Sequence, residues 1–188
     1  MEQSRPRRPH LERVLIVAGD QNAGKSTLLR RMFVDPRLGT EGVIPTSPRI
    51  PLVALSRERC LLFRLSSPHE KGESLNLFLK KLGRSMNRAW RHFWRFNLAC
   101  AMQPTATNLT PDLVTICTEI HRRLWPERVR VVQIDPRQDN QRGTLLAAHE
   151  IDRLRRLPVE VLTIDGRQPA TPTQHPNGFL LADFFDFT

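Results

Sequence analysis

The chain has 188 residues, 29 Lys and Arg against 19 Asp and Glu, and a formal net charge of +10. A chain of this length indicates one domain, large enough for a central sheet that is covered on both faces. The positive charge indicates an acidic partner, such as nucleic acid, an anionic membrane or an acidic protein, or else it reflects a basic host proteome.

Cysteine usage and hydropathy exclude several classes of protein. Cys60, Cys100 and Cys117 each lie in an apolar run without a C-x-x-C pair, so we expect buried, reduced thiols and neither a disulfide framework nor a metal site. No apolar run approaches the ~20 residues that span a bilayer. Residues 1–12 have no apolar h-region and are therefore not a secretory signal. We expect a soluble, cytoplasmic protein in which residues 1–12 form a disordered basic arm.

A short stretch near the N-terminus carries the strongest signal. Residues 13–33 read RVLIVAGDQNAGKSTLLRRMF. The apolar run at 14–18 predicts a buried strand, and apolar residues recur at helical spacing from 28 to 33. Between them, GDQNAGKS fits the phosphate-binding pattern G-x-x-x-x-G-K-[ST] in the strand-then-helix context that this pattern requires.

Each part of this loop has a chemical reason. Gly19 and Gly24 allow the tight turn that points successive N–H groups at phosphate oxygens, and the following helix adds its positive dipole end. Lys25 places a cation on the β and γ phosphates, and the Ser26 hydroxyl is a ligand for Mg²⁺. We therefore predict that a nucleoside triphosphate binds to Gly19, Asp20, Gln21, Asn22, Ala23, Gly24, Lys25, Ser26 and Thr27.

The rest of the chain is predicted to alternate strands with helices. The expected strands are residues 50–55, 60–65, 96–102, 129–134 and 159–164. The expected helices are residues 73–95, 110–124 and 145–157. Gly83 either interrupts the first of these helices or leaves it continuous. The second begins with Thr110 as N-cap and Pro111 in the first position. A polar turn at 56–59 makes the first two of these strands a hairpin. The fold class is thus α/β, with a mostly parallel sheet, one antiparallel edge hairpin and helices on both faces.

Over residues 13–167 this order of elements resembles that of the small GTPases, within the wider translation-factor-like class. GDQNAGKSTLL is similar to the G-x-P-N-V-G-K-S-T-L-L loop of bacterial GTPases. The resemblance implies a three-layer P-loop NTPase fold that binds GTP (or ATP) with Mg²⁺. It also implies that a threonine after the first helix senses the γ-phosphate through Mg²⁺. Thr46 lies at a suitable distance past Lys25, and Thr40 is the second choice.

The base-reading motifs of that family are degenerate in this chain. The place of N-K-x-D, after the fifth strand, reads PRQD and keeps only the aspartate, Asp139. In the family, an aspartate there accepts hydrogen bonds from N1 and N2 of guanine, which adenine does not offer. The S-A-K turn is replaced by DGR, where the N–H of Gly166 and the stem of Arg167 are the substitutes that the resemblance implies. A loop aspartate that is merely solvated is the alternative.

The segment after the third strand departs furthest from the family. The family has D-x-x-G there, whereas residues 65–70 read LSSPHE. Ser66 or Ser67 is a weak candidate for holding a metal-bound water, and Glu70 or His69 for orienting an attacking water. Alternatively none of them does so and hydrolysis is slow or absent, because phosphoryl transfer depends on positioning and charge neutralisation. The candidate catalytic residues are Lys25, Glu70 and His69, and the candidate metal ligands are Ser26 and Thr46.

Two further segments leave alternatives open. Residues 84–95 interleave arginines with aromatic residues. This pattern suits a helix that binds a phosphate backbone, bases or an acidic protein groove, or one that packs its aromatic stripe on the sheet. Residues 168–188 comprise a Pro-rich linker and a Phe-rich acidic peptide, which either docks on a partner or packs against the chain itself.

These patterns together predict a GTP-binding switch or assembly subunit. Nucleotide would order the loops at 35–51 and 66–72 and change the affinity for at least one protein partner, which binds these loops or the C-terminal peptide. The first alternative is an ATP-binding P-loop ATPase that associates with nucleic acid through its basic surface. A small-molecule or nucleoside kinase, and a structural subunit that keeps nucleotide as a stabilising ligand, are the remaining alternatives.

Overall fold

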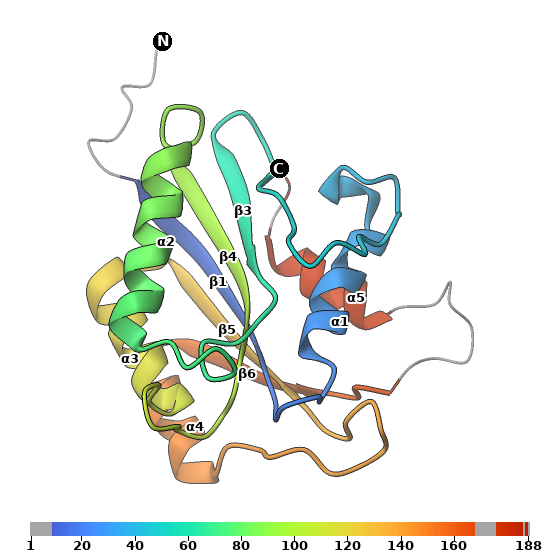
Figure 1. Cartoon of the computed structure of the whole chain (residues 1–188), viewed down its shortest axis with the longest axis vertical. Coiled ribbons are helices and arrows are strands. Elements are labelled where there is room, and N and C mark those ends of the chain that lie inside the picture. The colour runs from blue at the N-terminus through green and yellow to red at the C-terminus, as the bar shows by residue number, and fades with distance from the viewer. Residues whose placement is uncertain (1–8, 168–175, 186, 188) are drawn as a thin grey trace.

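The computed structural model describes residues 9–167, 176–185 and 187. Its centre is a six-stranded sheet in the order β2-β3-β4-β1-β5-β6 (Figure 1). The strands are β1 (His10–Ala18), β2 (Val53–Ala54), β3 (Arg59–Arg64), β4 (Arg95–Met102), β5 (Arg128–Ile134) and β6 (Val159–Ile164). All neighbours run parallel except β2 and β3, which are antiparallel. The predicted mostly parallel sheet with one antiparallel edge pair is confirmed.

Helices cover both faces of the sheet (Figure 1). One face carries α2 (Leu75–Ala89), α3 (Leu113–Leu124) and α4 (Ala148–Arg155), and the other carries α1 (Lys25–Arg31) and α5 (Pro176–Ala182). The 3₁₀ helices η1 (Met32–Val34), η2 (Pro36–Leu38) and η3 (Asp183–Phe185) follow α1 and α5. Each face has its own buried apolar cluster, as a parallel sheet requires. Among the described residues, no helix combines the length and the apolar character needed to cross a membrane.

β1 is a central strand, and the glycine loop, residues 19–26, begins at its carboxyl end. In register, Ile16 lies beside Cys100 of β4 on one side and Val131 of β5 on the other. Residues 14–18 are buried because the strand is covered on both faces. The segments after β4 and β5 therefore flank the glycine loop directly. The segment after β3 starts one strand further away and has to cross the end of β4 to reach it.

β1 begins earlier than the sequence predicts. Leu11 pairs in parallel with Phe96 of β4, and Leu11 and Glu12 are buried. The carboxylate of Glu12 lies 2.8 Å from the guanidinium groups of both Arg59 and Arg95. The expected disordered arm is therefore wrong for residues 10–12, which belong to the sheet, while residues 1–8 lie outside the described residues.

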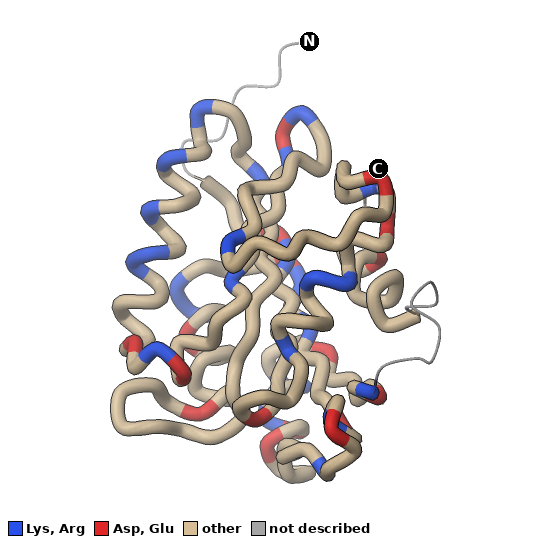
Figure 2. Tube along the Cα trace, turned by 45° about the vertical axis from the view of Figure 1, so that its right-hand side comes forward, with Lys and Arg blue, Asp and Glu red and all other residues tan. Residues whose placement is uncertain are grey.

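α2 and the turn that follows it show how the aromatic residues of 84–95 pack. The helix is continuous through Gly83 and ends at Ala89, before the predicted end at residue 95. Trp90 and Phe93 pack against the apolar cluster under α2, so the packing interpretation of the aromatic stripe is confirmed. Basic residues follow one another along α2 (Figure 2), and three of them are exposed: Lys80, Arg84 and Arg88.

The residue that caps the N-terminus of α3 is not the one that the sequence predicts. Asp112 is the N-cap, and its carboxylate accepts a hydrogen bond from the N–H of Thr115 at 2.9 Å. The predicted cap, Thr110, instead donates its hydroxyl to the carbonyl oxygen of Glu73 at 2.5 Å. That contact ties the start of α3 to the segment before α2. α4 and β2 are also shorter than the predicted ranges 145–157 and 50–55.

The C-terminal peptide packs against the chain itself. α5 lies along α1 and η1 (Figure 1), and Leu181 of α5 and Phe184 and Phe185 of η3 are buried in the apolar cluster on that face. Gly178 lies where α5 meets α1, and an added Cβ there would be 2.3 Å from the carbonyl oxygen of Arg31. The compact unit therefore extends beyond residue 167, where the prediction ended it, and the self-packing interpretation is confirmed. The predicted linker at 168–175 lies outside the described residues.

All three cysteines are free and buried, as predicted. Burial raises the pKa of Cys60 and Cys100 to about 12 and also raises the pKa of Cys117. The thiols therefore stay protonated near neutral pH and act as small apolar residues of the core.

Candidate functional site

The glycine loop turns tightly between β1 and α1. Gly24 is the N-cap of α1 with a left-handed φ of 97°, and a Cβ there would lie 3.0 Å from the side-chain oxygen of Gln138. A Cβ at Gly19 would lie 3.0 Å from the Cβ of Ala23. A larger residue at position 24 would therefore be strained in its backbone and would clash with Gln138. A larger residue at position 19 would only clash, with Ala23.

Lys25 is buried at the start of α1, with its side chain 4% exposed. Its ammonium group donates to the carbonyl oxygen of Asp20 at 2.5 Å and lies 2.9 Å from Oε1 of Glu70. A buried ammonium needs an anionic partner because desolvation strongly disfavours an unpaired charge. The Glu70 carboxylate supplies that charge from residues 66–72, the segment that crosses the end of β4.

A cavity of about 210 Å³ opens beside Lys25. It is lined by Gln21, Asn22, Gly24, Lys25, Ser26, Thr27, Leu65, Glu70 and Gln138. Most of the loop residues that the sequence singles out thus meet in one place, with three residues from distant segments. The volume is below the ~300–1,000 Å³ of typical ligand pockets, so only part of a nucleotide-sized ligand would fit inside.

The loop at 135–144, after β5, covers one side of the glycine loop. Gln138 donates its side-chain amide to the carbonyl oxygen of Asn22 at 3.0 Å. The N–H of Thr144 donates to the carboxylate of Asp20 at 3.0 Å. Sequence reasoning missed Gln138 and Thr144, because their contacts depend on β5 lying beside β1, and nothing in their local pattern signals it.

Asp135, at the start of this covering loop, is bonded to two residues near the end of the same loop. Its carboxylate accepts hydrogen bonds from the N–H of Gly143 at 3.0 Å and from the guanidinium of Arg142 at 2.8 Å. These contacts, that of Gly143 first, lower the pKa of Asp135. Gly143 also packs so closely that an added Cβ would lie 2.0 Å from the carbonyl oxygen of Ile134. The covering loop is therefore held in two ways, by the bonds between its own two ends and by its contacts with the glycine loop.

Asp139, the predicted base-reading residue, lies in the covering loop with its carboxylate engaged. It accepts from the N–H of Gln141 at 3.2 Å and lies 3.0 Å from the guanidinium of Arg137. Arg137 also donates to the carbonyl oxygen of Gln21 at 3.4 Å, which keeps Asp139 near the glycine loop. A base that used Asp139 would have to share its carboxylate with Arg137 or displace Arg137 from it.

Gly166 and Arg167 lie beside the covering loop, each bonded to a neighbouring residue. The N–H of Gly166 donates to the carbonyl oxygen of Pro136 at 2.8 Å. A Cβ at Gly166 would lie 2.4 Å from a methyl carbon of Ile134, at the end of β5, and 2.9 Å from the carbonyl oxygen of Pro136, so Gly166 packs closely against the start of the covering loop. Arg167 pairs with Asp165, with Nε 2.9 Å from Oδ1. The N–H of Gly166 and the guanidinium of Arg167 are thus both bonded within the protein.

Ser26 and Thr46, the candidate metal ligands, are not brought together. Ser26 lines the glycine-loop cavity, and Thr46 does not. Thr46 is exposed in the loop before β2, which Arg30 of α1 holds by donating to the carbonyl oxygens of Pro45 at 2.8 Å and Ser47 at 2.5 Å. Thr46 would reach the cavity only if this loop moved.

His69 is buried and joins residues 66–72 to the segments after β4. Nδ1 lies 3.0 Å from Oγ of Ser67 and accepts from the N–H of Gln103 at 3.4 Å. Nε2 lies 2.9 Å from the carbonyl oxygen of Pro111 and therefore carries the proton of the neutral ring. Burial lowers the pKa of His69 despite the opposing hydrogen bond to Pro111. Since both nitrogens are engaged, His69 would have to leave these partners before it could orient a water.

Protonation of His69 is expected to destabilise the fold. Its pKa in the folded chain is lowered from the ordinary value of 6.5, so the unfolded chain binds the proton more readily. The stability that the neutral ring contributes is thus fully present above that value and is lost as the pH falls below it. Thermal unfolding should have a lower midpoint at about pH 5.5 than at about pH 7.5.

His69→Gln should lower the midpoint at about pH 7.5 and flatten its dependence on pH, because Gln does not titrate. His149→Gln changes an exposed histidine and should keep the wild-type pH dependence. A flat wild-type profile between these two pH values would contradict the role given to His69.

Known proteins give no further guide to this site. Comparison of the chain with family models, curated proteins and solved structures returned no match. In the ranges 9–167, 176–185 and 187, no three or more His, Cys, Asp or Glu side chains are grouped so as to hold a metal ion. The assignment of a function therefore rests on the geometry and chemistry of the site.

Proposed function

We propose that the chain is a P-loop nucleoside-triphosphate-binding protein, and that it works as a GTP-binding, small-GTPase-like switch or assembly subunit with slow or absent hydrolysis. The observation that carries this proposal is Lys25, a buried ammonium at a small cavity within a loop that fits G-x-x-x-x-G-K-[ST]. The loop joins a buried strand to a helix, which is the setting in which this pattern binds phosphates.

Binding would exchange one anion for another at Lys25. A phosphate group offers more charge and more acceptor oxygens than a carboxylate, so the β- or γ-phosphate would replace Glu70, now 2.9 Å from the ammonium. Glu70 belongs to residues 66–72, and its release would allow that segment to rearrange. This exchange would connect nucleotide binding to a surface loop, as a switch requires.

The residues at the cavity fit Mg²⁺ only together with bound phosphates. Mg²⁺ is usually held by one or two protein oxygens, phosphate oxygens and water. Ser26 lines the cavity and offers a hydroxyl, and phosphate oxygens and water would supply the other ligands. When bound, the ion would neutralise part of the phosphate charge.

Slow or absent hydrolysis is part of the proposal because few groups at the cavity could position a water or neutralise charge. Phosphoryl transfer needs both. In the described part of the chain, Lys25 is the only cation that lines the cavity, and Glu70, the only acid, would leave with residues 66–72 when a phosphate replaces it. His69 is bonded through both ring nitrogens.

Titration with fluorescent, non-hydrolysable GTP and ATP analogues in the presence of Mg²⁺ tests the proposal and its base preference. The wild-type chain should bind the GTP analogue at least tenfold more tightly, or about 1.4 kcal/mol. Asp139→Ala should remove this preference, because it removes the carboxylate that would accept hydrogen bonds from guanine. Asp152→Ala, at an exposed position of α4, is the matched control.

Two other results would overturn parts of the proposal. Equal or tighter ATP binding, unchanged by Asp139→Ala, would favour an ATP-binding P-loop ATPase that associates with nucleic acid through basic residues such as those exposed on α2. Binding of neither analogue would overturn nucleotide binding itself.

Removing the charge of Glu70 is expected to tighten nucleotide binding. In Glu70→Gln the ligand no longer has to break the ion pair, and the buried ammonium of Lys25 is left without an anionic partner, so affinity should rise at least roughly 5-fold. Glu41→Gln, at an exposed loop position, should bind like the wild type in the same titration. Weaker binding by Glu70→Gln would contradict the exchange and assign the carboxylate to ligand binding through Mg²⁺.

A further inference from the structure

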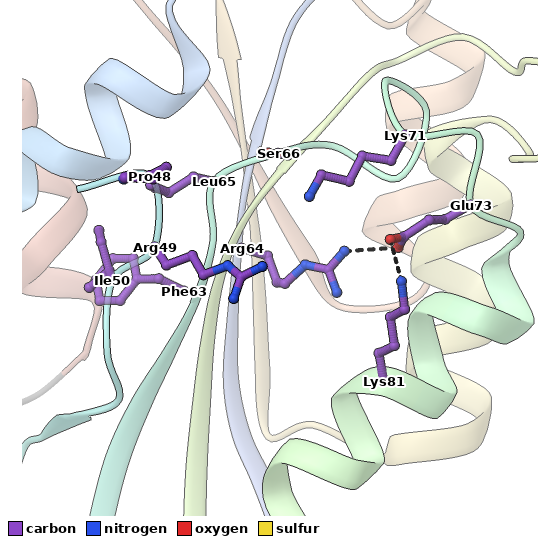
Figure 3. Close-up of a pocket in the computed structure, with 10 residues that line it drawn as sticks. All are labelled: Pro48, Arg49, Ile50, Phe63, Arg64, Leu65, Ser66, Lys71, Glu73 and Lys81. Carbon is purple, nitrogen blue, oxygen red and sulfur yellow. Dashed lines mark hydrogen bonds and ion pairs between the residues drawn. The ribbon is translucent and has the colours of Figure 1, made fainter. Parts of the chain in front are cut away.

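Four basic side chains from four segments converge beside the carboxyl end of β3. Figure 3 shows Arg49 from the loop before β2, Arg64 from β3, Lys71 from the segment after β3 and Lys81 from α2 around one cavity. This basic cavity has a volume of about 300 Å³, at the lower end of the range of ligand pockets.

The charge in the basic cavity is not balanced. Glu73 is the only carboxylate among its described lining residues, and it lies 2.9 Å from Arg64 and 2.6 Å from Lys81. Burial opposes the ionisation of Glu73, but the hydrogen bonds from Lys81 and Arg64 outweigh it and lower the pKa of this carboxyl group. Neither Arg49 nor Lys71 has an acidic partner within the described ranges. Four cations thus face one carboxylate among the described lining residues, and Arg49 and Lys71 are the two that are unpaired.

Arg64, and the backbone of the loop that carries Arg49, are held in place before a ligand arrives. Arg64 is fixed by Glu73 and by its position over the ring of Phe78, 5.4 Å from the ring centre. The loop that carries Arg49 is tied to α1 by the two hydrogen bonds from Arg30 to carbonyl oxygens. Holding these parts in advance reduces the entropy that is lost when an anion binds.

The basic cavity and the glycine-loop cavity are neighbours but distinct. Leu65 lines both of them. The consecutive residues Glu70 and Lys71 line one cavity each, Glu70 the glycine-loop cavity and Lys71 the basic cavity. Ile50 and Phe63 add apolar surface to the basic cavity, next to its cations. The ligand that fits combines a compact anionic group with an apolar or planar part.

We propose that the basic cavity is a second anion site, which binds the phosphate monoester group of a ligand independently of the glycine loop. A phosphate monoester carries a charge of about −1.5 to −2 at pH 7, which matches the two unpaired cations better than a carboxylate does. Its three oxygens also suit guanidinium donors, which bind phosphate in pairs of parallel hydrogen bonds. The phosphate belongs to a nucleoside monophosphate or to the 5′-phosphorylated end of a nucleic acid strand.

Calorimetric titration of the full Lys25→Ala chain tests this proposal, because that substitution removes phosphate binding at the glycine loop. The probes are adenosine monophosphate and a short 5′-phosphorylated single-stranded oligonucleotide. Arg49→Gln and Lys71→Gln, both at exposed positions, should each weaken binding at least about tenfold, and added salt should weaken it further. Arg57→Gln, in the exposed turn before β3, is the matched control and should change nothing.

Each outcome of the titration decides the proposal. Binding of adenosine monophosphate that Arg49→Gln and Lys71→Gln weaken supports a small-molecule ligand. Binding of the oligonucleotide alone, lost in the same variants and without the 5′-phosphate, supports the same site with a nucleic acid end as ligand. Binding of neither probe, or equal binding by Arg49→Gln and Arg57→Gln, overturns the proposal. If Lys25→Ala does not fold, the wild-type chain gives the same readout with adenosine monophosphate, which lacks the phosphates assigned to Lys25.

Discussion

Replacing Lys25 with alanine is expected to weaken nucleoside-triphosphate binding by roughly 30- to 100-fold. The substitution removes the buried ammonium that we assign to the β and γ phosphates, and a charged hydrogen bond of this kind is worth about 2–3 kcal/mol. It also leaves the carboxylate of Glu70 beside the phosphates without a cation, which adds repulsion. Titration with non-hydrolysable analogues in Mg²⁺ measures the loss.

Lys80→Ala is the matched control for this substitution. Lys80 is exposed on α2, so this variant should bind nucleotide like the wild type. Thermal unfolding of both variants shows whether they are folded. If Lys25→Ala is folded and binds as tightly as Lys80→Ala, the phosphates are not bound at the glycine loop.

Replacing Phe184 with alanine is expected to destabilise the chain by about 3–5 kcal/mol, the usual cost of emptying the space of a buried phenylalanine. Phe184 is 2% exposed, and its ring lies 4.6 Å from the guanidinium of Arg130. Its carbonyl oxygen accepts a hydrogen bond from Arg13 at 2.6 Å, which ties the C-terminal segment to β1. The midpoint of thermal unfolding should fall by roughly 10 °C in a chain of this size.

Phe179→Ala provides the comparison within the same segment. Phe179 lies in α5 but is 42% exposed, so this substitution should cost less than about 1 kcal/mol. Similar small losses in the two variants would show that the C-terminal segment adds little to the stability of the folded chain.

The local parts of the fold could be predicted from the sequence. An apolar run followed by GDQNAGKS and an amphipathic helix specifies β1, the glycine loop and α1, because each depends only on residues close by in the chain. The need for glycine follows from the same turn, at Gly19 through the contact with Ala23 and at Gly24 through the left-handed φ of 97°. The six apolar strand segments likewise predicted an α/β sheet with one antiparallel edge pair.

Contacts between distant segments could not be predicted in this way. An apolar strand has the same pattern wherever it lies in a parallel sheet, so the sequence of β4 does not indicate that it lies between β3 and β1. Gln138 is a neutral residue in a polar loop, and its contact with Asn22 exists only because β5 lies beside β1. The convergence of Arg49 and Lys81 on one cavity is of the same kind.

Element boundaries were mispredicted where a polar residue finds a distant partner. Residues 1–12 were expected to form a disordered basic arm, but the pairing of Glu12 with Arg59 and Arg95 allows Glu12 to be buried in β1. Thr110 has the residue type of a helix cap, but its hydroxyl is committed to a carbonyl oxygen before α2, and Asp112 caps α3 instead. A local sequence pattern does not show whether a polar side chain bonds to its neighbours in the chain or to a distant segment.

Backbone amide resonances of residues 19–27 test the central proposal most directly. In an isotopically labelled chain, a non-hydrolysable GTP analogue with Mg²⁺ is predicted to shift these amides, because their N–H groups would face the phosphates. The amide of Glu70 should shift as well, because its side chain would leave Lys25. If saturating ligand left the amides of residues 19–27 unchanged, or shifted only those around Arg49 and Lys71, the assignment of the glycine loop as the nucleotide site would be contradicted.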